Sequence, residues 1–196
     1  MPRKPSRTRD QVIDAAMRHF WRRGYHATSI DDLIETVGVS RHTLYSAIGG
    51  KHEVYLRCFD VYQDAVVTPA FEKVEDGNAT LDAIAEYFEK QIALAAAQGL
   101  PGPGCLVANA ATETAPHDAL AAQKVQEHHH RLKTGFAKVL LNAAPQLSAA
   151  DRSNLADFLV TSAQGLWSMS RTVHYASALR EQASLILSLI ELRCAQ

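Results

Sequence analysis

The chain has 196 residues, of which 47% are apolar and 21% charged, and its formal net charge is −1. It is too apolar and too evenly charged for a disordered chain, and no run of about 18 or more apolar residues predicts a membrane span. The basic start, residues 1–7, is not followed by an apolar core, so we expect no signal peptide. Three widely spaced cysteines, Cys58, Cys105 and Cys194, argue against a disulfide framework and indicate a reducing cytoplasm.

The net charge conceals an asymmetry along the chain. Residues 1–57 hold ten Lys and Arg against six Asp and Glu, a balance of +4. Residues 58–196 hold ten basic and fifteen acidic residues, a balance of −5. A basic head on an acidic body indicates that the head meets a polyanion and that the body has another role.

Apolar residues recur at helical spacing along almost the whole chain, and no alternating run indicates a sheet. Glycine and proline divide this pattern into about nine helical segments, so the sequence predicts an all-α fold. The stretch 100–104, Leu-Pro-Gly-Pro-Gly, is expected to be a loop, and Pro69 is expected to bend or end the fourth segment. In chain order the expected segments are 12–24, 29–38, 40–49, 51–69, 78–99, 105–115, 117–143, 148–173 and 178–192.

The second and third segments form the most informative unit. Thr28 is expected to cap the second segment, with Asp31 three residues further on. Gly38 supplies the permissive backbone position of a tight turn, and Ser40 caps the next helix. Two short helices joined by a short turn that contains glycine form a helix-turn-helix, whose second helix enters the major groove of DNA.

Side chains suited to DNA follow that turn. Arg41, His42 and Thr43 fall in the first turn of the third segment, where they can reach base edges or phosphates. Tyr45 carries a hydroxyl for a phosphate oxygen, and Lys51 begins a helix whose N–H groups and dipole favour phosphate. The alternative is that two amphipathic helices around a glycine only build a helical core. The residues predicted to contact DNA are Thr28, Ser40, Arg41, His42, Thr43, Tyr45 and Lys51.

Residues from about Thr8 to Phe59 resemble the DNA-binding domain of the TetR family of bacterial transcription regulators. The resemblance implies a three-helix DNA-binding head over residues 1–55, joined by the fourth helix to a ligand-binding and dimerisation body over residues 56–196. One departure is Ala47-Ile48, where the family often has aromatic residues. The matching residues are Phe20, Gly24-Tyr25, Thr28-Ser29-Ile30, Leu33-Ile34, Gly38-Val39-Ser40, Thr43-Leu44-Tyr45, Gly49, Lys51 and Val54-Tyr55.

The function that this resemblance implies is a ligand-responsive regulator, most often a repressor. It would bind a palindromic operator on double-stranded DNA as a homodimer in the cytoplasm, and a small-molecule effector would release it. One alternative is a DNA-organising protein without an effector. Another is a helical cysteine-dependent enzyme, but the sequence has no Gly-rich phosphate loop, no paired-carboxylate motif and no obvious Ser/His/Asp set. We therefore expect no enzyme, no cofactor and no membrane partner.

The last segment is apolar nearly all round, which predicts that it is buried on two sides. The second buried face indicates a subunit interface formed with the preceding segment, whose two-fold symmetry would match a palindromic operator. The alternative is a central core helix in a monomer. Candidate interface residues are Leu155, Phe158, Leu159, Ser162, Leu166, Ile186, Leu189 and Ile190.

A ligand pocket is expected where apolar side chains with polar tips gather in the body. Within it, Cys105, Asn109 and Glu113 recur every four residues on one face of a short helix, and this segment resembles a motif of some TetR subfamilies. Asn109 and Glu113 would recognise a polar ligand group or, alternatively, fix the helix by hydrogen bonds; any candidate can also be plain core. The candidates are Tyr87, Phe88, Cys105, Asn109, Glu113, Trp167, Met169 and Tyr175.

Two further features have competing interpretations. Cys105 begins a helix, where the dipole would lower the pKa of its thiol and make it a sensor of electrophiles or oxidants. The alternative is a small buried apolar residue, as free cysteines usually are. His128, His129 and His130 point about 100° apart on a helix and match no zinc spacing, so we expect a solvated helix face and no metal.

Overall fold

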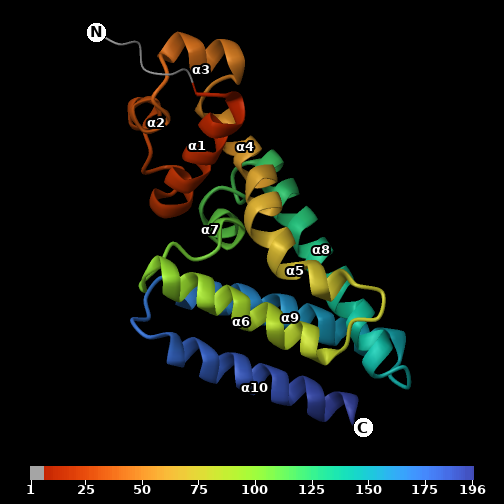
Figure 1. Ribbon diagram of the computed structural model, residues 1–196. Helices are drawn as coiled ribbons and strands as arrows, with labels where there is room; N and C mark the ends of the chain where they lie inside the picture. Colours follow the sequence, from red (N-terminus) through yellow and green to blue (C-terminus); the bar gives the residue numbers. More distant parts are fainter. Residues whose placement is uncertain (1–6) are drawn as a thin grey trace.

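The computed structural model describes residues 7–196, and within them all regular structure is helical (Figure 1). The all-α prediction is confirmed. Helices α4 and α5 are joined through η1 into one continuous helix. The ten α-helices of the described residues therefore form nine separate helical segments, and about nine were expected. Arg3 and Lys4, which contribute to the basic excess of the head, lie outside the described residues. The helices are α1 (Arg9–Arg23), α2 (Ile30–Val37), α3 (Arg41–Ala47), α4 (Lys51–Tyr62), the π-helical segment η1 (Gln63–Val67), α5 (Thr68–Glu75), α6 (Leu81–Gln98), α7 (Leu106–Glu113), α8 (Ala119–Ala143), α9 (Ala149–Met169) and α10 (Ala176–Cys194).

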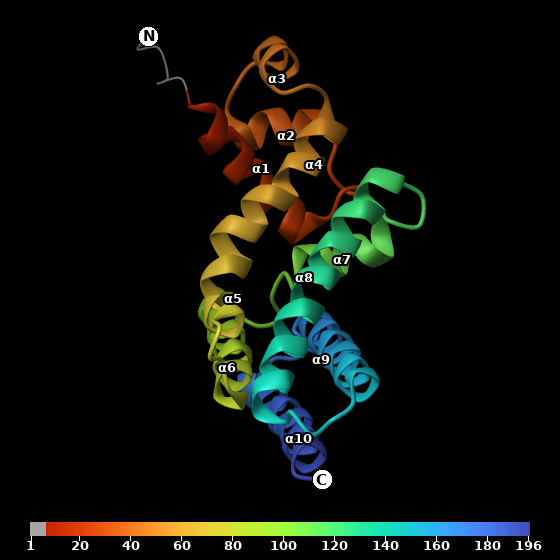
Figure 2. The same ribbon diagram turned by 90° about the vertical axis from the view of Figure 1, so that its right-hand side faces the viewer.

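Helices α1, α2 and α3, with the first turns of α4, form a small head at one end of the molecule (Figure 2). Its core is made of fully buried apolar side chains that recur at helical spacing on each helix. These include Met17, Phe20, Leu33 and Leu44. The apolar faces predicted from the sequence therefore point inward, and the polar faces point to solvent.

Helix α2 begins one residue later than expected. Ser29, not Thr28, is its N-cap: the Ser29 hydroxyl accepts from the amide of Asp32, and the Asp32 carboxylate accepts from the amide of Ser29. Thr28 is only 1% exposed, and its hydroxyl donates to the carbonyl of Gly24 at 2.7 Å. The prediction that Thr28 caps α2 is wrong because the next residue offers an equally good hydroxyl.

The turn between α2 and α3 has the predicted geometry. Gly38 ends α2 in the left-handed region, with φ +69°, which favours glycine. Ser40 then caps α3, since its hydroxyl accepts from the amide of Thr43 at 3.0 Å. The chain reverses within a few residues, so the short helix α3 stands at the far end of the head.

Pro69 does not end the helix that begins at Lys51. The chain widens into the π-helical segment before it, and Pro69 then occupies the first turn of α5, where a missing N–H costs little. Helix α4 thus continues through η1 to Glu75 and connects the head to the body. Of the two outcomes expected at Pro69, a bend or an end, the end is wrong for this reason.

The body is a bundle in which α8 packs against α9, and α6 against α10. Rings meet at its centre: Phe71 lies edge-on to Tyr87 and to Phe136, with centroids 5.2 and 5.3 Å apart. A side chain at Gly135 of α8 would place its Cβ 2.6 Å from the ring of Phe71. Glycine at this position therefore allows α5 and α8 to approach closely.

Helix α10 lies at the edge of the body and not in its centre (Figure 1). One side, with Leu179 and Ile190, is buried against α6 and α9. The other side leaves Leu185, Leu189 and Leu192 between 43% and 59% exposed. The interpretation of α10 as the central core helix of a monomer is therefore wrong. No helix of residues 7–196 is both long enough and apolar enough to cross a bilayer.

Candidate nucleic-acid interface and body cavity

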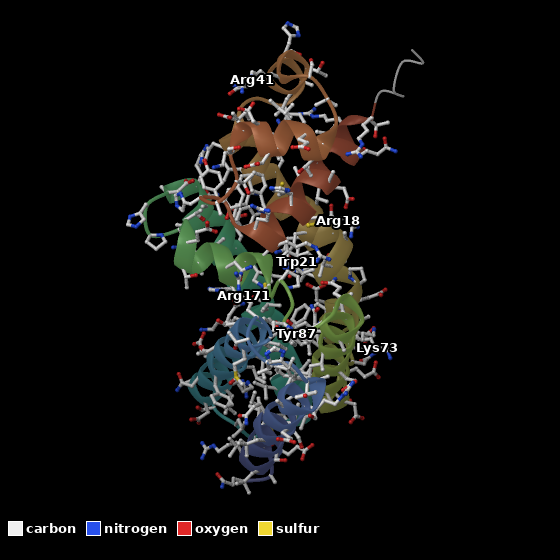
Figure 3. All side chains as sticks on the ribbon, turned by 90° about the vertical axis from the view of Figure 1, so that its left-hand side faces the viewer. Arg18, Trp21, Arg41, Lys73, Tyr87 and Arg171 are labelled. Carbon is white, nitrogen blue, oxygen red and sulfur yellow. The ribbon has the colours of Figure 1, made fainter. Side chains whose placement is uncertain are left out.

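Helix α3 presents a polar face to solvent at the tip of the head (Figure 3). Arg41, His42 and Thr43 are exposed, and Tyr45 is 50% exposed. On its other face Leu44 is buried in the head core, as expected from its spacing. The first turn of α3 therefore offers a guanidinium, an imidazole and hydroxyls together on one convex surface, where a DNA groove can reach them.

Arg41 is held across the turn by Asp31 of α2, with Nη2 2.5 Å from Oδ1. Both side chains are more than half exposed, so water screens this ion pair and it contributes little stability. An arriving phosphate or guanine can therefore replace Asp31 at little cost. Ser40, at the start of α3, is also exposed.

Lys51 occupies a different environment from the one expected. Its Nζ lies 4.0 Å from the ring centroid of Tyr25, and burial lowers the pKa of Lys51. The helix start itself is already occupied, because the Glu53 carboxylate accepts from the amide of Gly50 at 2.8 Å. Lys51 must leave the Tyr25 ring if it is to contact a phosphate.

The head is joined to the body through α7. The Glu113 carboxylate accepts from the amides of Tyr25 and His26 at 3.1 and 2.8 Å. Gly24 precedes them with φ +85°, and a Cβ there would lie 2.9 Å from Glu113 Oε1. Asn109, one turn earlier, donates to the carbonyl of Pro103 at 2.9 Å and to that of Trp21 at 3.5 Å. These two side chains hold α7 to the end of α1.

A second set of contacts joins α4 to the loop after α7. His52 Nε2 lies 2.6 Å from Asp118 Oδ2, and the Tyr55 hydroxyl lies 3.1 Å from that of Thr114. Burial alone would raise the pKa of Asp118, but hydrogen bonds from His52 and from the amides of Ala121 and Leu120 lower it. Burial raises the pKa of Tyr55 to about 12, so its hydroxyl keeps its proton.

A small cavity lies behind this junction, between α1 and the body helices. Trp21 and Tyr87 form parts of its wall and lie one above the other in the middle of the molecule (Figure 3). Trp21 also donates from Nε1 to the carbonyl of Gly104 at 2.9 Å. The cavity measures about 20 Å³, enough for about one water molecule. The wall further includes Tyr62, Cys105, His128 and Trp167.

The sequence of the head matches that of known DNA-binding proteins. Residues 12–58 match the family model of the bacterial regulatory proteins of the tetR family. The chain belongs to the TetR family.

Relatives extend this match along the whole chain. It is 26% identical over 188 residues to the uncharacterized HTH-type transcriptional regulator YezE of Bacillus subtilis (strain 168), covering 92% of this chain and 94% of that protein. It is 26% identical over 162 residues to the HTH-type transcriptional repressor ComR of Escherichia coli (strain K12), covering 81% and 77%.

Among solved structures, a cysteine mutant of the TetR family transcriptional regulator CifR complexed with 26-bp double-strand operator DNA has the same fold. Its TM-score is 0.80 at 24% identity, over 96% of this chain and 98% of that one. This likeness shows the fold. The match to the tetR family model and to the regulator YezE makes the chain a DNA-binding transcriptional regulator of the TetR family.

Three of the side chains predicted for the ligand pocket of this TetR protein line the cavity, namely Tyr87, Cys105 and Trp167. Phe88 is buried in the core beside Trp167, with ring centroids 6.2 Å apart. Met169 and Tyr175 are 41% and 75% exposed at the end of α9 and just beyond it, so the structure does not support them as pocket residues. Whether Met169 and Tyr175 face the cavity depends on where α9 ends, and the pattern of apolar residues does not define that end.

Asn109 and Glu113 also lie outside the cavity wall. Both face the head, and the alternative interpretation, that they fix α7 by hydrogen bonds, agrees with the structure. Thr28 belongs to the α1–α2 loop, and with 1% exposure its side chain is not available to DNA. Asn109, Glu113 and Thr28 each form hydrogen bonds to backbone groups of other segments or turns. The spacing of residues along one helix does not reveal such partners.

The sequence did not identify Trp21, Tyr62 and His128 as cavity residues. Trp21 belongs to the head, and His128 was expected on a solvated face, yet it is only 3% exposed. That expectation is wrong for His128, whereas His130 is exposed. The signal available was the position of His128 between Val125 and Leu132, which are both buried on the inner face of α8. No group of three or more metal-binding side chains gathers anywhere in residues 7–196.

Cys105 is a buried thiol. It is 5% exposed, and burial raises its pKa although the Tyr62 hydroxyl and two backbone amides partly oppose that shift. The expected lowering of the pKa by the helix start is therefore wrong, because desolvation of the thiolate outweighs the dipole. A thiol with a raised pKa reacts slowly with electrophiles, so the structure does not favour Cys105 as a sensor.

Of the residues predicted at a dimer interface, three are buried within the chain itself: Leu159, Leu166 and Ile190. They are therefore not available to a partner. Phe158 and Leu189 are exposed. The remaining candidates, Leu155, Ser162 and Ile186, are half-buried.

Proposed function

We propose that this TetR-family regulator represses transcription as a homodimer on a palindromic operator, and that a small-molecule effector bound in the body cavity releases it. The DNA-binding head would comprise residues 1–55, and the ligand-binding and dimerisation body residues 56–196. The observation that carries the proposal is the polar face of α3, where Arg41, His42, Thr43 and Tyr45 are exposed while Leu44 fixes the helix to the head.

In the proposed complex, α3 lies in the major groove. Arg41 and His42 reach base edges, because they stand in the first turn of the helix. Ser40, Thr43 and Tyr45 bind phosphates through their hydroxyls, and Lys51 joins them after leaving the Tyr25 ring. These contacts place one head on one half of the operator.

The homodimer would form through α9 and α10. Phe158 of α9 is 39% exposed, and Leu185 and Leu189, four residues apart on α10, are 55% and 43% exposed. A second copy that presents the same face would cover these side chains and place the two heads on one side of the dimer. The name of the relative ComR, a transcriptional repressor, supports the direction of regulation.

The effector would act through α7. Cys105 at the start of this helix borders the cavity, and Glu113 at its end binds the α1–α2 loop of the head. A ligand that enlarges the cavity pushes on α7 and on Trp21, and so turns the head relative to the body. The ligand favours release from DNA only if it binds more tightly to the conformation with the turned head than to the DNA-bound conformation.

The direct test is selection of DNA fragments from a random pool by the purified protein. We expect an inverted repeat, with half-sites about 34–36 Å or a multiple of this apart along the duplex. Enrichment of a single half-site, or of no sequence, would contradict the proposal.

A further inference from the structure

The cavity is unusual in the chemistry of its wall. Among the described residues, those that line it include no Asp, Glu, Lys or Arg. Four aromatic rings, those of Trp21, Tyr62, Tyr87 and Trp167, contribute to the wall. A charged ligand in such a cavity would lose its hydration without gaining an ionic partner, at a large cost in free energy. The wall therefore selects against ions of either sign.

The polar side chains that line the cavity include Gln91, Gln98, Ser170 and His128, and among them His128 is the titratable one whose protonation state burial defines. Burial, with the charges of His129 and Arg131, lowers the pKa of His128 to about 3, so the ring is neutral at neutral pH. A neutral imidazole carries its proton on one nitrogen only, and the hydrogen bond at the other nitrogen decides which. The partners of the ring therefore define what it offers to a ligand.

A chain of hydrogen bonds fixes that proton. Arg131 pairs with Glu75 through Nε and Nη2, at 2.7 and 2.8 Å. Its Nη1 donates to Gln63 Oε1 at 3.3 Å, so the other end of the Gln63 amide is the donor. Gln63 Nε2 lies 2.9 Å from His128 Nδ1, which must accept. The proton of His128 is therefore on Nε2.

The position of Gln63 explains which edge of the ring is left for a ligand. Gln63 is the first residue of the π-helical segment η1, and π-turns are frequent at functional sites. It borders a surface hollow that His128 also lines, and it does not border the cavity. Because Nδ1 is paired with Gln63 and His128 also borders the cavity, the Nε2 edge is the polar part of the ring left for a ligand there. No hydrogen bond to another group of the described residues occupies Nε2.

We propose that the ligand of this cavity is a small, uncharged, flat molecule with a carbonyl-type oxygen, and that the Nε2–H of His128 donates to that oxygen. The aromatic walls stack on the flat body of the ligand, and Gln63 is a positioning residue that holds His128 in the donor tautomer. Since the empty cavity holds about one water, the ligand enters by displacing side chains on α6. Leu94 is 36% exposed there and borders the cavity.

The two tryptophans of the chain, Trp21 and Trp167, both line the cavity, so intrinsic fluorescence reports its occupation directly. The probes are four compounds of similar size: acetophenone, ethylbenzene, benzoate and benzylammonium. We expect saturable quenching by acetophenone, at least about tenfold weaker binding of ethylbenzene, which lacks the acceptor, and no saturable signal from either ion. Equal binding of ethylbenzene, tighter binding of either ion, or no saturation with acetophenone would overturn the proposal.

Two variants test the hydrogen bond itself. His128→Leu removes the donor, and Gln63→Glu replaces the donating amide with a carboxylate that takes the proton on Nδ1. Both should weaken acetophenone binding about tenfold and leave ethylbenzene binding within about twofold of the unmodified protein. The matched controls are His130→Leu and Gln182→Glu, which alter exposed side chains of α8 and α10 and should change neither. Retention of full acetophenone affinity by both test variants would exclude His128 as the donor.

This inference rests on the proposed function only in that the cavity is the effector site. A second measurement, operator affinity with and without acetophenone, separates the two. If acetophenone binds as expected and operator affinity is unchanged, the ligand chemistry is supported and the release mechanism fails. If the operator is bound normally and acetophenone does not quench, the regulator stands and the ligand assignment fails.

Discussion

Glu113 is the side chain that joins the head to the body most directly. Its two carboxylate oxygens satisfy two successive amides of the α1–α2 loop, those of Tyr25 and His26. The Tyr25 amide is half-buried, and the loss of its acceptor costs about 1–3 kcal/mol, whereas water can replace the acceptor of the exposed His26 amide. This one contact thus links the stability of the head to the position of α7.

Glu113→Ala should therefore lower the free energy of unfolding by about 1–3 kcal/mol, measured by urea denaturation. The matched control is Glu181→Ala, which removes an exposed carboxylate of α10 and should change stability by less than about 0.5 kcal/mol. If both variants unfold at the same urea concentration, Glu113 does not fasten the head.

The burial of His128 predicts how the free energy of unfolding depends on pH. Its pKa is about 3 in the folded chain and 6.5 when unfolded, so the unfolded chain binds the extra proton between these values. The stability that this neutral ring contributes is complete above pH 6.5 and is lost as the pH falls, at up to about 1.4 kcal/mol per pH unit. His128→Asn should reduce the slope of unfolding free energy between pH 6 and about 4 by this amount.

The control for this slope is His130→Asn, because His130 is exposed on the same helix. It should retain the full pH dependence of the unmodified protein. Identical slopes for the two variants would show that His128 is not buried in its neutral form.

At the scale of elements, α3 and the start of α4 have different expected roles on DNA. Arg41→Ala should cost about 1–3 kcal/mol on the selected operator and relax sequence preference, since a base contact is lost. Lys51→Ala should weaken binding evenly across sequences and reduce the salt slope by about 1, since a phosphate contact is lost. Titrations of labelled duplexes at several salt concentrations measure both, with Arg193→Ala of α10 as the control. No effect of either head variant would contradict the assignment of α3.

The elements themselves were predicted well where one local signal defines them. Gly38 and Ser40 define the turn and the start of α3, and the spacing of Leu44 fixes its inner face. The errors occur where two neighbouring residues offer the same cap, as Thr28 and Ser29 do, or where a π-turn accommodates a proline. Both depend on small free-energy differences that composition does not resolve.

At the scale of the whole molecule, the sequence could not show how the head docks on the body. Trp21 enters the cavity wall and Glu113 binds the head, so each side chain functions across the junction of two parts of the chain. Helical periodicity identifies which face of a helix is apolar, but not which distant segment covers it. The wall of the cavity was therefore predicted only in part, and His128 in that wall was missed.

The exposed apolar face of α10 leads to a prediction about the oligomeric state of the protein. Leu189→Glu should convert the dimer into a monomer of 21.5 kDa in sedimentation at micromolar concentration, because a buried charge would face its own copy across the two-fold axis. Leu141→Glu is the control, since Leu141 is 48% exposed and belongs to α8, which is not part of the proposed interface. A monomeric unmodified protein would contradict the proposed interface.

The central claim is that two copies of this chain place two α3 helices on one operator. The most direct measurement is the stoichiometry of the complex on the selected duplex, by sedimentation of labelled DNA with increasing protein. We predict an even number of chains per duplex, two or a multiple of two, and no stable complex for Leu189→Glu at the same concentration. A saturated complex with one chain per duplex would contradict the account.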